Sequence, residues 1–160
     1  MSEEQDSIIA YYAEQRCAQP WRTFLSAMSE EFSQRLSVPE MRQLMHRIGT
    51  RIAATHPIAA CRTVSELQHA MNQRFAELGW GWTRIEETER ALAVTHFCLP
   101  FSAALGPHAM AWTPALLEGA YQDWFKSLGA GGALRVTQRM GDAAGTKMTN
   151  GQKLEFRLSR

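Results

Sequence analysis

The chain has 160 residues and a mass of 18.0 kDa; 45% of its residues are hydrophobic and 21% are charged. This length suits a single domain over residues 1–160, and the apolar content excludes a chain that is disordered throughout. The net charge of +1 argues against a nucleic-acid-binding protein, and no apolar run approaches the ~18 residues of a membrane-spanning helix.

The first residues and the cysteines bear on the compartment. Residues 1–6 are acidic and contain no apolar run, so they do not read as a secretory signal. Cys17, Cys61 and Cys98 are odd in number and form no CxxC pair, which favours free thiols in a reducing compartment. We therefore expect a cytoplasmic protein, with the periplasm as the alternative.

Charge is distributed in blocks along the chain. Residues 1–15 hold four acids and no base, residues 16–74 eight bases and four acids, residues 75–124 two bases and six acids, and the last 36 residues seven bases and two acids. Fourteen of the 17 bases are Arg, which forms planar, bidentate contacts at interfaces. This pattern fits either solvated faces or association between copies of the chain.

The N-terminal part of the chain predicts an extension followed by a helix. Residues 1–20 form the extension, which we expect to be mobile or to lie in an interface. Residues 22–36 follow with apolar side chains at helical spacing: Phe24, Leu25, Met28, Phe32 and Leu36.

Two further helices are marked by capping signals. Ser37 and Glu40 form a capping box, which begins a helix that ends at His56-Pro57 and carries an apolar stripe: Met41, Leu44, Met45, Ile48 and Ile52. Thr63 and Glu66 form a second box, which begins a helix that ends at Gly79.

The hydrophobic period then changes to two. Residues 80–87 and 90–98 predict an antiparallel hairpin around the turn Glu86–Glu89, and a loop follows over residues 100–112. Thr113-Pro114 predicts a helix start with Thr113 as its cap, and that helix runs to Leu128. Two more strands, 134–140 and 154–158, flank a loop at 141–151. The expected fold class is α+β, with N-terminal helices packed with a four-stranded, mostly antiparallel sheet in the order helices–ββ–α–ββ.

The sequence offers little catalytic chemistry. Gly129–Gly132 follows a helix and precedes a strand, the wrong order for a phosphate-binding loop. His96 and Cys98 share a strand face but supply only two metal ligands, so a half-buried strand histidine is the better interpretation. The carboxylates at the hairpin turn are expected to be solvated. We therefore expect a protein that is not an enzyme and that holds no cofactor and no metal.

The five tryptophans are the remaining candidates for binding. Aromatic faces stack on sugar rings and also anchor protein interfaces. Trp124 is expected in the core and Trp21 on a helix, whereas Trp82 and Trp112 fit core, interface and ligand contact equally well.

Several motifs together resemble the bacterial cellulose synthase operon protein D (BcsD) family over roughly residues 22–140. The residues that carry the resemblance are Met41–Ile52 (MRQLMHRIGTRI), Cys61–Val64 (CRTV), Leu67, Leu78–Gly81 (LGWG) and Trp112–Tyr121 (WTPALLEGAY).

The resemblance implies a non-catalytic accessory subunit that promotes ordered, crystalline cellulose export. It implies a homo-oligomer, an octamer built as a tetramer of dimers, which organises synthase complexes and has a Pro-rich protein and the glucan chain as further partners. Gly49 and Gly119 would let helix backbones meet, across an interface or within one chain. Tyr11 and Tyr12 belong to an acidic N-terminal segment that departs from the family, so no glucan contact transfers to them by residue. With Trp21, Trp82 and Trp112 they complete the candidate interface or glucan-stacking residues.

One alternative comes from a different class of protein. A small-molecule or lipid-binding module of the vinyl-reductase-like type shares the order helices–ββ–α–ββ. This alternative predicts an internal apolar cavity and a co-purified ligand, whereas the first predicts a defined large oligomer.

Overall fold

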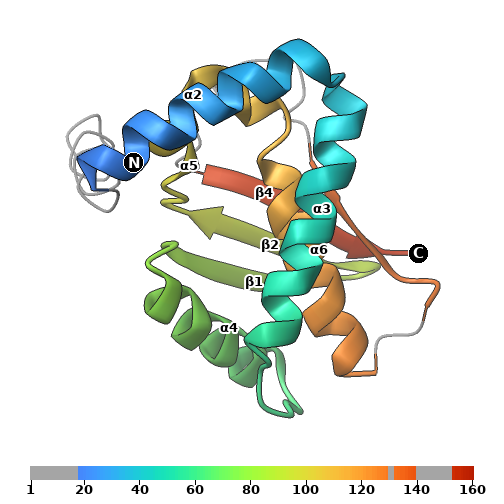
Figure 1. Cartoon of the computed structure of the whole chain (residues 1–160). Coiled ribbons are helices and arrows are strands. Elements are labelled where there is room, and N and C mark those ends of the chain that lie inside the picture. The colour runs from blue at the N-terminus through green and yellow to red at the C-terminus, as the bar shows by residue number, and fades with distance from the viewer. Residues whose placement is uncertain (1–17, 130–131, 140–152) are drawn as a thin grey trace.

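The computed structural model of the chain describes residues 18–129, 132–139 and 153–160. Three helices precede a hairpin, a helical segment and two further strands, so the predicted α+β class is confirmed (Figure 1). The elements are α2 (Gln19–Arg35), α3 (Val38–Thr55), α4 (Val64–Leu78), β1 (Trp82–Thr88), β2 (Ala91–Phe97), α5 (Phe101–Leu105), the 3₁₀ helix η1 (Pro107–Ala111), α6 (Pro114–Ser127), β3 (Arg135–Gln138) and β4 (Lys153–Ser159).

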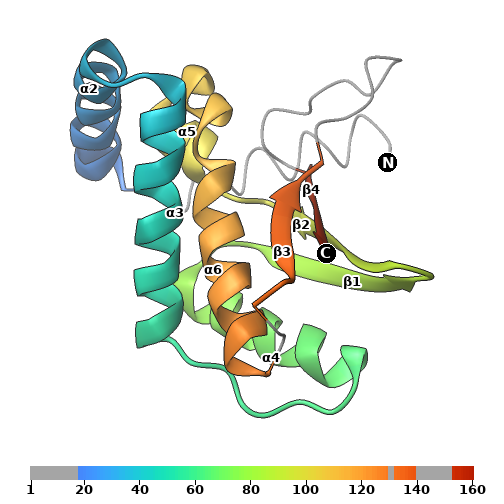
Figure 2. The same ribbon diagram turned by 90° about the vertical axis from the view of Figure 1, so that its right-hand side faces the viewer.

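The four strands form one antiparallel sheet in the order β1-β2-β4-β3. The C-terminal strand β4 is therefore central, between β2 and the short strand β3. Figure 2 shows α6 between the sheet and α3, so that α3 forms an outer layer. Helix α3 therefore contacts the sheet through α6, whereas α4 packs directly on β1.

The predicted capping box of α3 and the Thr63 cap of α4 are confirmed, whereas the Glu66 carboxylate accepts from the Arg62 N–H and not from that of Thr63. The Glu40 carboxylate accepts hydrogen bonds from the backbone N–H and the hydroxyl of Ser37, at 2.8 and 2.7 Å. The Thr63 hydroxyl accepts from the Glu66 N–H at 3.1 Å. Gly79 ends α4 in the left-handed region at φ 68°, a conformation that glycine adopts without a Cβ clash.

The hairpin turn differs from the prediction. The expected turn covered Glu86–Glu89, but β1 continues to Thr88, which pairs with Ala91. Two residues, Glu89 and Arg90, therefore make the connection. Acidic residues occur at the exposed end of a strand as well as in a turn. A prediction based on their polarity therefore began the turn too early in the sequence.

The segment expected as a loop over residues 100–112 contains two short helices, α5 and η1. Each is too short to leave a periodic apolar stripe in the sequence. Because η1 leads almost directly into α6, Thr113 has helical backbone angles and makes no side-chain cap, contrary to the prediction. Pro114 does occupy the first turn of α6, as predicted.

Aromatic rings fill the space between α4, α6 and the sheet. The side chains of Phe75, Tyr121, Trp124 and Phe156 are at most 1% exposed. Phe75 contacts both Tyr121 and Trp124 in edge-to-face geometry, and Tyr121 packs on Phe156. Trp124 therefore lies in the core, as predicted.

Side chains from two helices cover both edges of the sheet. At the β1 edge, the Asn72 side chain exchanges two hydrogen bonds with the backbone of Thr83, and Gln68 accepts from the Ile85 N–H at 2.8 Å. At the β3 edge, Gln122 accepts from the Val136 N–H at 2.8 Å, and its amide donates to the Leu134 carbonyl at 2.9 Å. In addition, Glu118 accepts from the Gln138 N–H at 2.7 Å. Each edge is thus covered by an i, i+4 pair of polar side chains on one helix.

Asn72→Ala is expected to lower the free energy of unfolding by about 2 kcal/mol, because it strips the buried Thr83 backbone of two partners. Urea unfolding measures the change. Gln73→Ala, at the adjacent exposed position, is the matched control, and its change is expected to stay below about 0.5 kcal/mol. Equal effects of the two substitutions would contradict the edge-covering role of Asn72.

Candidate functional site

The two candidate glycines lie at the crossing of α3 and α6. A Cβ on Gly49 would lie 1.8 Å from the Leu116 carbonyl oxygen, and one on Gly119 would lie 2.0 Å from the His46 carbonyl oxygen. The close approach of backbones that these glycines permit therefore occurs within the chain. The Thr50 hydroxyl bonds the carbonyl oxygens of His46 and Gly119 at the same crossing.

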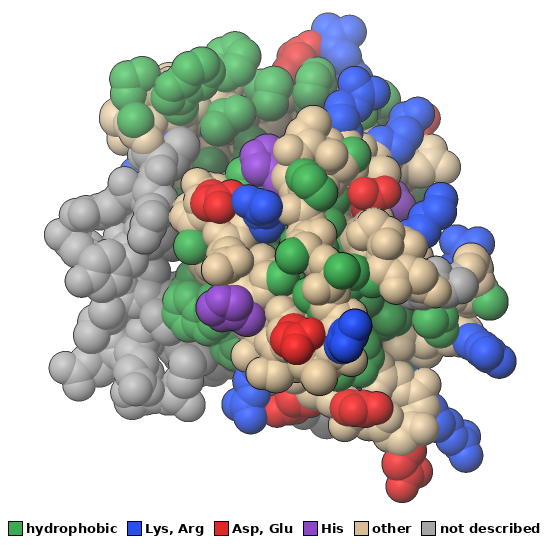
Figure 3. Space-filling view, turned by 90° about the horizontal axis from the view of Figure 1, so that it is seen from below, with side chains coloured by type: hydrophobic (Ala, Val, Ile, Leu, Met, Phe, Trp, Pro, Cys, Tyr) green, Lys and Arg blue, Asp and Glu red, His purple; other side chains and the backbone are tan. Residues whose placement is uncertain are grey.

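A half-buried ion pair connects α3 and α6. Arg42 of α3 contacts the Glu118 carboxylate at 2.9 Å, and its guanidinium also donates to the Ala111 carbonyl and the Gln138 side chain. Arg42 belongs to the basic sequence block and Glu118 to the acidic block that follows it. The blocks thus partly neutralise each other within one chain, and Figure 3 shows acidic and basic side chains interspersed on the face seen from below.

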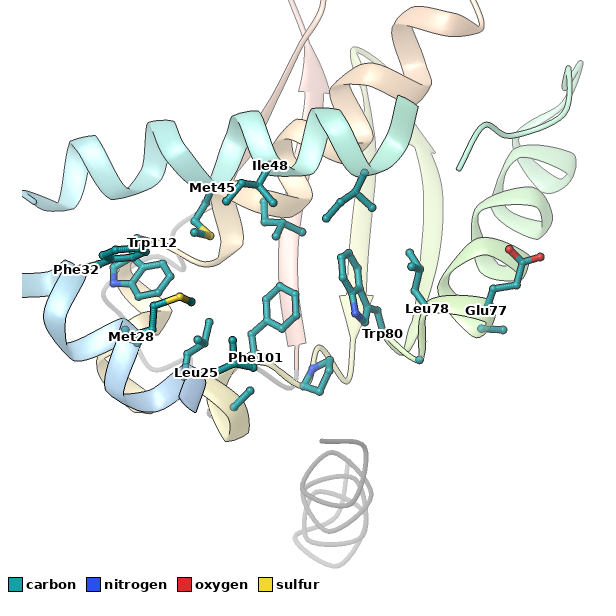
Figure 4. A pocket seen from close by; sticks show the side chains of 18 residues that line it. Leu25, Met28, Phe32, Met45, Ile48, Glu77, Leu78, Trp80, Phe101 and Trp112 are labelled. Carbon is teal, nitrogen blue, oxygen red and sulfur yellow. The ribbon is translucent and has the colours of Figure 1, made fainter. Parts of the chain in front are cut away.

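An apolar, partly enclosed groove of about 590 Å³ lies beside this crossing, between α2, α3 and α5, and Figure 4 shows the side chains that line it. The side chains that line it come from five elements and their connections, and most of them are apolar. They include Leu25, Met28 and Phe32 of α2, Met45, Ile48 and Ile52 of α3, and Trp80, Phe101, Leu105 and Trp112. We define this lined space as the groove.

The groove lies along a part of the apolar stripe of α3 that the neighbouring elements cover only in part. Met41, Gly49 and Ala53 are the buried residues of α3. Gly49 faces α6, and Ala53 belongs to the main core. Met45, Ile48 and Ile52, which belong to the predicted apolar stripe with Met41 and Leu44, are partly buried against the core and line the groove. Part of the apolar surface of α3 is therefore left uncovered by the described residues.

The structure separates the three candidate tryptophans. Trp112 is 3% exposed and forms part of the groove wall, in a small cluster with Met41 and Ala109. Trp82 is 46% exposed and stacks on its cross-strand neighbour Phe97, with ring centroids 5.5 Å apart. Trp21 is 65% exposed on α2. These three side chains do not gather at one site.

The last two candidate residues, Tyr11 and Tyr12, and one exposed aromatic residue that was not predicted, Phe24, belong to the N-terminal part of the sequence. Tyr11 and Tyr12 fall outside the described residues, as does most of the expected extension, although α2 begins at Gln19 with Pro20 in its first turn. Phe24 was not singled out as a site residue, yet it is 57% exposed and contacts Trp21 edge-on. The signal available in the sequence was the i, i+3 spacing of two aromatic residues on a predicted helix.

The histidine expected as half-buried is fully buried. The Nε2–H group of His96 donates to the Trp80 carbonyl at 2.7 Å, so Nδ1 accepts from the Tyr121 hydroxyl at 2.8 Å. Burial lowers the pKa of His96 to about 4, against the smaller opposing effect of the Trp80 hydrogen bond. The ring is therefore neutral at pH 7, and both of its nitrogens have structural partners.

Cys98, the other half of the two-ligand pair, was expected on the strand but lies just beyond the end of β2, in the left-handed region at φ 63°. Burial raises the pKa of its thiol to about 11, so that the thiol is protonated at neutral pH. Within residues 18–129, 132–139 and 153–160, no three His, Cys, Asp or Glu side chains gather in a way that could hold a metal ion. In the same ranges, no helix is both long enough and apolar enough to cross a bilayer.

The sequence of the chain is similar to that of one family of known proteins. The family model for the D subunit of cellulose synthase matches residues 7–151. Two proteins named cellulose synthase operon protein D, from Komagataeibacter xylinus and Komagataeibacter sucrofermentans, are each 30% identical to this chain over 118 residues. Those alignments cover 72% of this chain and 76% of each relative. A further K. xylinus protein of the same name is 29% identical.

Proposed function

The chain belongs to the cellulose synthase operon protein D family, and we propose that it is a non-catalytic accessory subunit that forms a homo-oligomeric scaffold for ordered cellulose export. The observation that carries the proposal is the family match over residues 7–151. The scaffold organises synthase complexes, so that neighbouring glucan chains emerge together and crystallise.

The geometry supports assembly better than catalysis. An open apolar groove and exposed aromatic side chains on α2 are features of surfaces that other macromolecules cover. The buried histidine is neutral and hydrogen-bonded on both nitrogens, which leaves it no proton-transfer role toward a solvent-borne substrate. We propose that residues 1–160 form one domain and that the chain assembles into an octamer of four dimers. Its partners are a synthase complex and a Pro-rich protein. The exposed ring of Trp82 provides an aromatic face for a glucan chain.

The proposed compartment is the cytoplasm. The thiols of Cys61 and Cys98 are unpaired, which fits a reducing environment. A scaffold there would hold the synthases in line from the side on which their substrate is supplied.

Deletion of the gene in its own cellulose-producing host is expected to lower both the yield and the crystallinity of the cellulose, because unaligned synthases release chains that do not crystallise together. Dry mass and X-ray diffraction of the purified polymer measure the two effects. Re-expression of the wild-type chain should restore both. A deletion strain with unchanged cellulose would contradict the proposal.

The groove also supports a second candidate, a small-molecule or lipid-binding module, because its volume lies within the range of ligand pockets. Native mass spectrometry of the purified protein separates the two functions. A bound lipid of defined mass on a monomer would favour this module, and a ligand-free oligomer would favour the scaffold.

A further inference from the structure

The apolar face of α2 continues from the groove to the N-terminal end of the helix. Leu25, Met28 and Phe32 line the groove. Trp21 continues their row one turn nearer the N-terminus, and its side chain is 65% exposed. Among the 17 residues of α2 only Ser29 is buried. The described residues thus leave an apolar path that leads from the first turn of α2 into the groove.

The chain changes direction where it enters α2. Ala18 has backbone angles of φ −59° and ψ 139°, which are not helical, and Pro20 lies in the first turn of the helix. A proline lacks the N–H group that would bond a carbonyl one turn earlier, so α2 does not extend toward the N-terminus as one straight helix. The change of direction at Ala18 therefore lies beside the exposed start of the apolar path.

The sequence of residues 1–17 predicts a helix with one apolar face. Ile8, Tyr11 and Tyr12 are spaced i, i+3 and i+4, which places them together on that face. The opposite face, at the same helical period, holds only acidic and small side chains: Glu3, Ser7, Ala10 and Glu14. A helix this short gains most of its stability from packing of its apolar face, so it needs an apolar surface to cover it.

We propose that residues 1–17 cover the groove of their own chain, with a helical run that includes Ile8 and Tyr12 lying antiparallel on α2. Both runs rise about 1.5 Å per residue from the connection between them. Tyr12 then comes within one turn of Leu25, and Ile8 comes within one turn of Met28. The apolar face of the segment meets the apolar path, while its acidic face points to solvent.

The length and the attachment of the segment favour it over other occupants of the groove. Seventeen residues of helix span about 25 Å, which equals the length of α2, so the segment reaches the far end of the groove at Phe32. Its covalent link to Ala18 gives it a high effective concentration at the groove, so it competes well with a free molecule. The segment thereby covers the part of α3 that the described residues leave open.

Photo-cross-linking in the whole chain tests this contact. The amino acid p-benzoylphenylalanine in place of Tyr12 inserts into nearby C–H bonds on irradiation, and tandem mass spectrometry of the digested product locates the new bond. The expected partner is Met28 or Met45, whose side chains line the groove. The same amino acid in place of Ala10, on the opposite face, is the matched control and should form no bond to either methionine.

Charged substitutions test the contact through stability. Ile8→Asp and Tyr12→Asp are each expected to raise the equilibrium constant for unfolding about 10-fold, because a carboxylate does not enter an apolar path without a partner. Urea unfolding measures the constant, and a dye that fluoresces on apolar surface should bind these variants more strongly than the wild type. Ala10→Asp adds the same charge on the other face, and its unfolding constant should stay within about 2-fold of the wild-type value.

Three results would overturn the proposal. A cross-linked product with twice the mass of the chain would assign the groove to a second copy, and a cross-link from position 12 to residues outside the groove would place the segment elsewhere. Equal stability of Tyr12→Asp and Ala10→Asp would show that the apolar face of the segment is not covered. The cross-link replaces one aromatic side chain with another, so it decides the question even if the charged variants do not fold.

The covered groove and the scaffold function fail separately. The proposed function is carried by the family match, whereas the covered groove is carried by the apolar path on α2 and the pattern of residues 1–17. Unchanged cellulose after deletion of the gene would contradict the scaffold and leave the covered groove standing. A cross-link outside the groove would do the reverse.

Discussion

Gly49→Ala and Gly119→Ala are each expected to lower the free energy of unfolding by about 3 kcal/mol. Each adds a Cβ within 2.0 Å of a carbonyl oxygen of the facing helix, so α3 and α6 must move apart. Overpacking against backbone costs more than the ~1 kcal/mol that alanine contributes to helix propensity. The melting temperature should fall by about 10 °C for a chain of this size.

A matched control and a double variant sharpen this prediction. Gly132→Ala adds a Cβ where nothing lies within 4 Å, and its effect is expected to stay within about 0.5 kcal/mol. The double variant should cost less than the sum of its parts, since helices already separated by one Cβ have room for the second. If both single substitutions change the free energy of unfolding as little as Gly132→Ala does, α3 and α6 do not cross as closely as described.

Stability is expected to fall by about 3 kcal/mol as the pH drops from 6.5 toward 4, because of His96. In the folded chain the pKa of His96 is about 4, below its ordinary value of 6.5. Between these two values the unfolded chain binds a proton that the folded chain does not, so acid favours unfolding. The contribution is fully present above pH 6.5 and is lost progressively below it.

Urea unfolding at a series of pH values from 7.5 to 4.5 measures this loss. The His96→Gln variant should be less stable at neutral pH and should show a flatter pH dependence than the wild type. His69→Gln, the matched control, removes an exposed histidine that hydrogen-bonds the Gln73 side chain on its own helix, and it should keep the wild-type slope. Parallel pH profiles for His96→Gln and the wild type would refute the assignment.

Much of the fold could be predicted because its signals are local. The helix starts at Ser37 and Thr63 and the helix end at Gly79 depend on hydrogen bonds within a few residues, and all three are confirmed. The strands follow from the period-two pattern. The short helices α5 and η1 could not be predicted in this way, because one or two turns show no periodicity.

The groove could not be predicted, because the face that a helix buries depends on what packs against it. In α3 the small residues Gly49 and Ala53 are the most buried, since they allow α6 to approach closely. The larger residues Met45 and Ile48, which dominate any apolar pattern, are left at the edge of that contact. Likewise, the glycine spacing predicted a close approach of helices, but only the structure shows that the second helix is in the same chain.

The covered edges of the sheet limit how copies of the chain can aggregate. A protein with an open sheet edge risks cross-β fibres, in which a strand of one molecule adds to the edge of another. Here Asn72 and Gln122 already occupy backbone groups that an incoming strand would need on β1 and β3. An incoming strand would first have to displace these side chains, which disfavours open-ended fibrils.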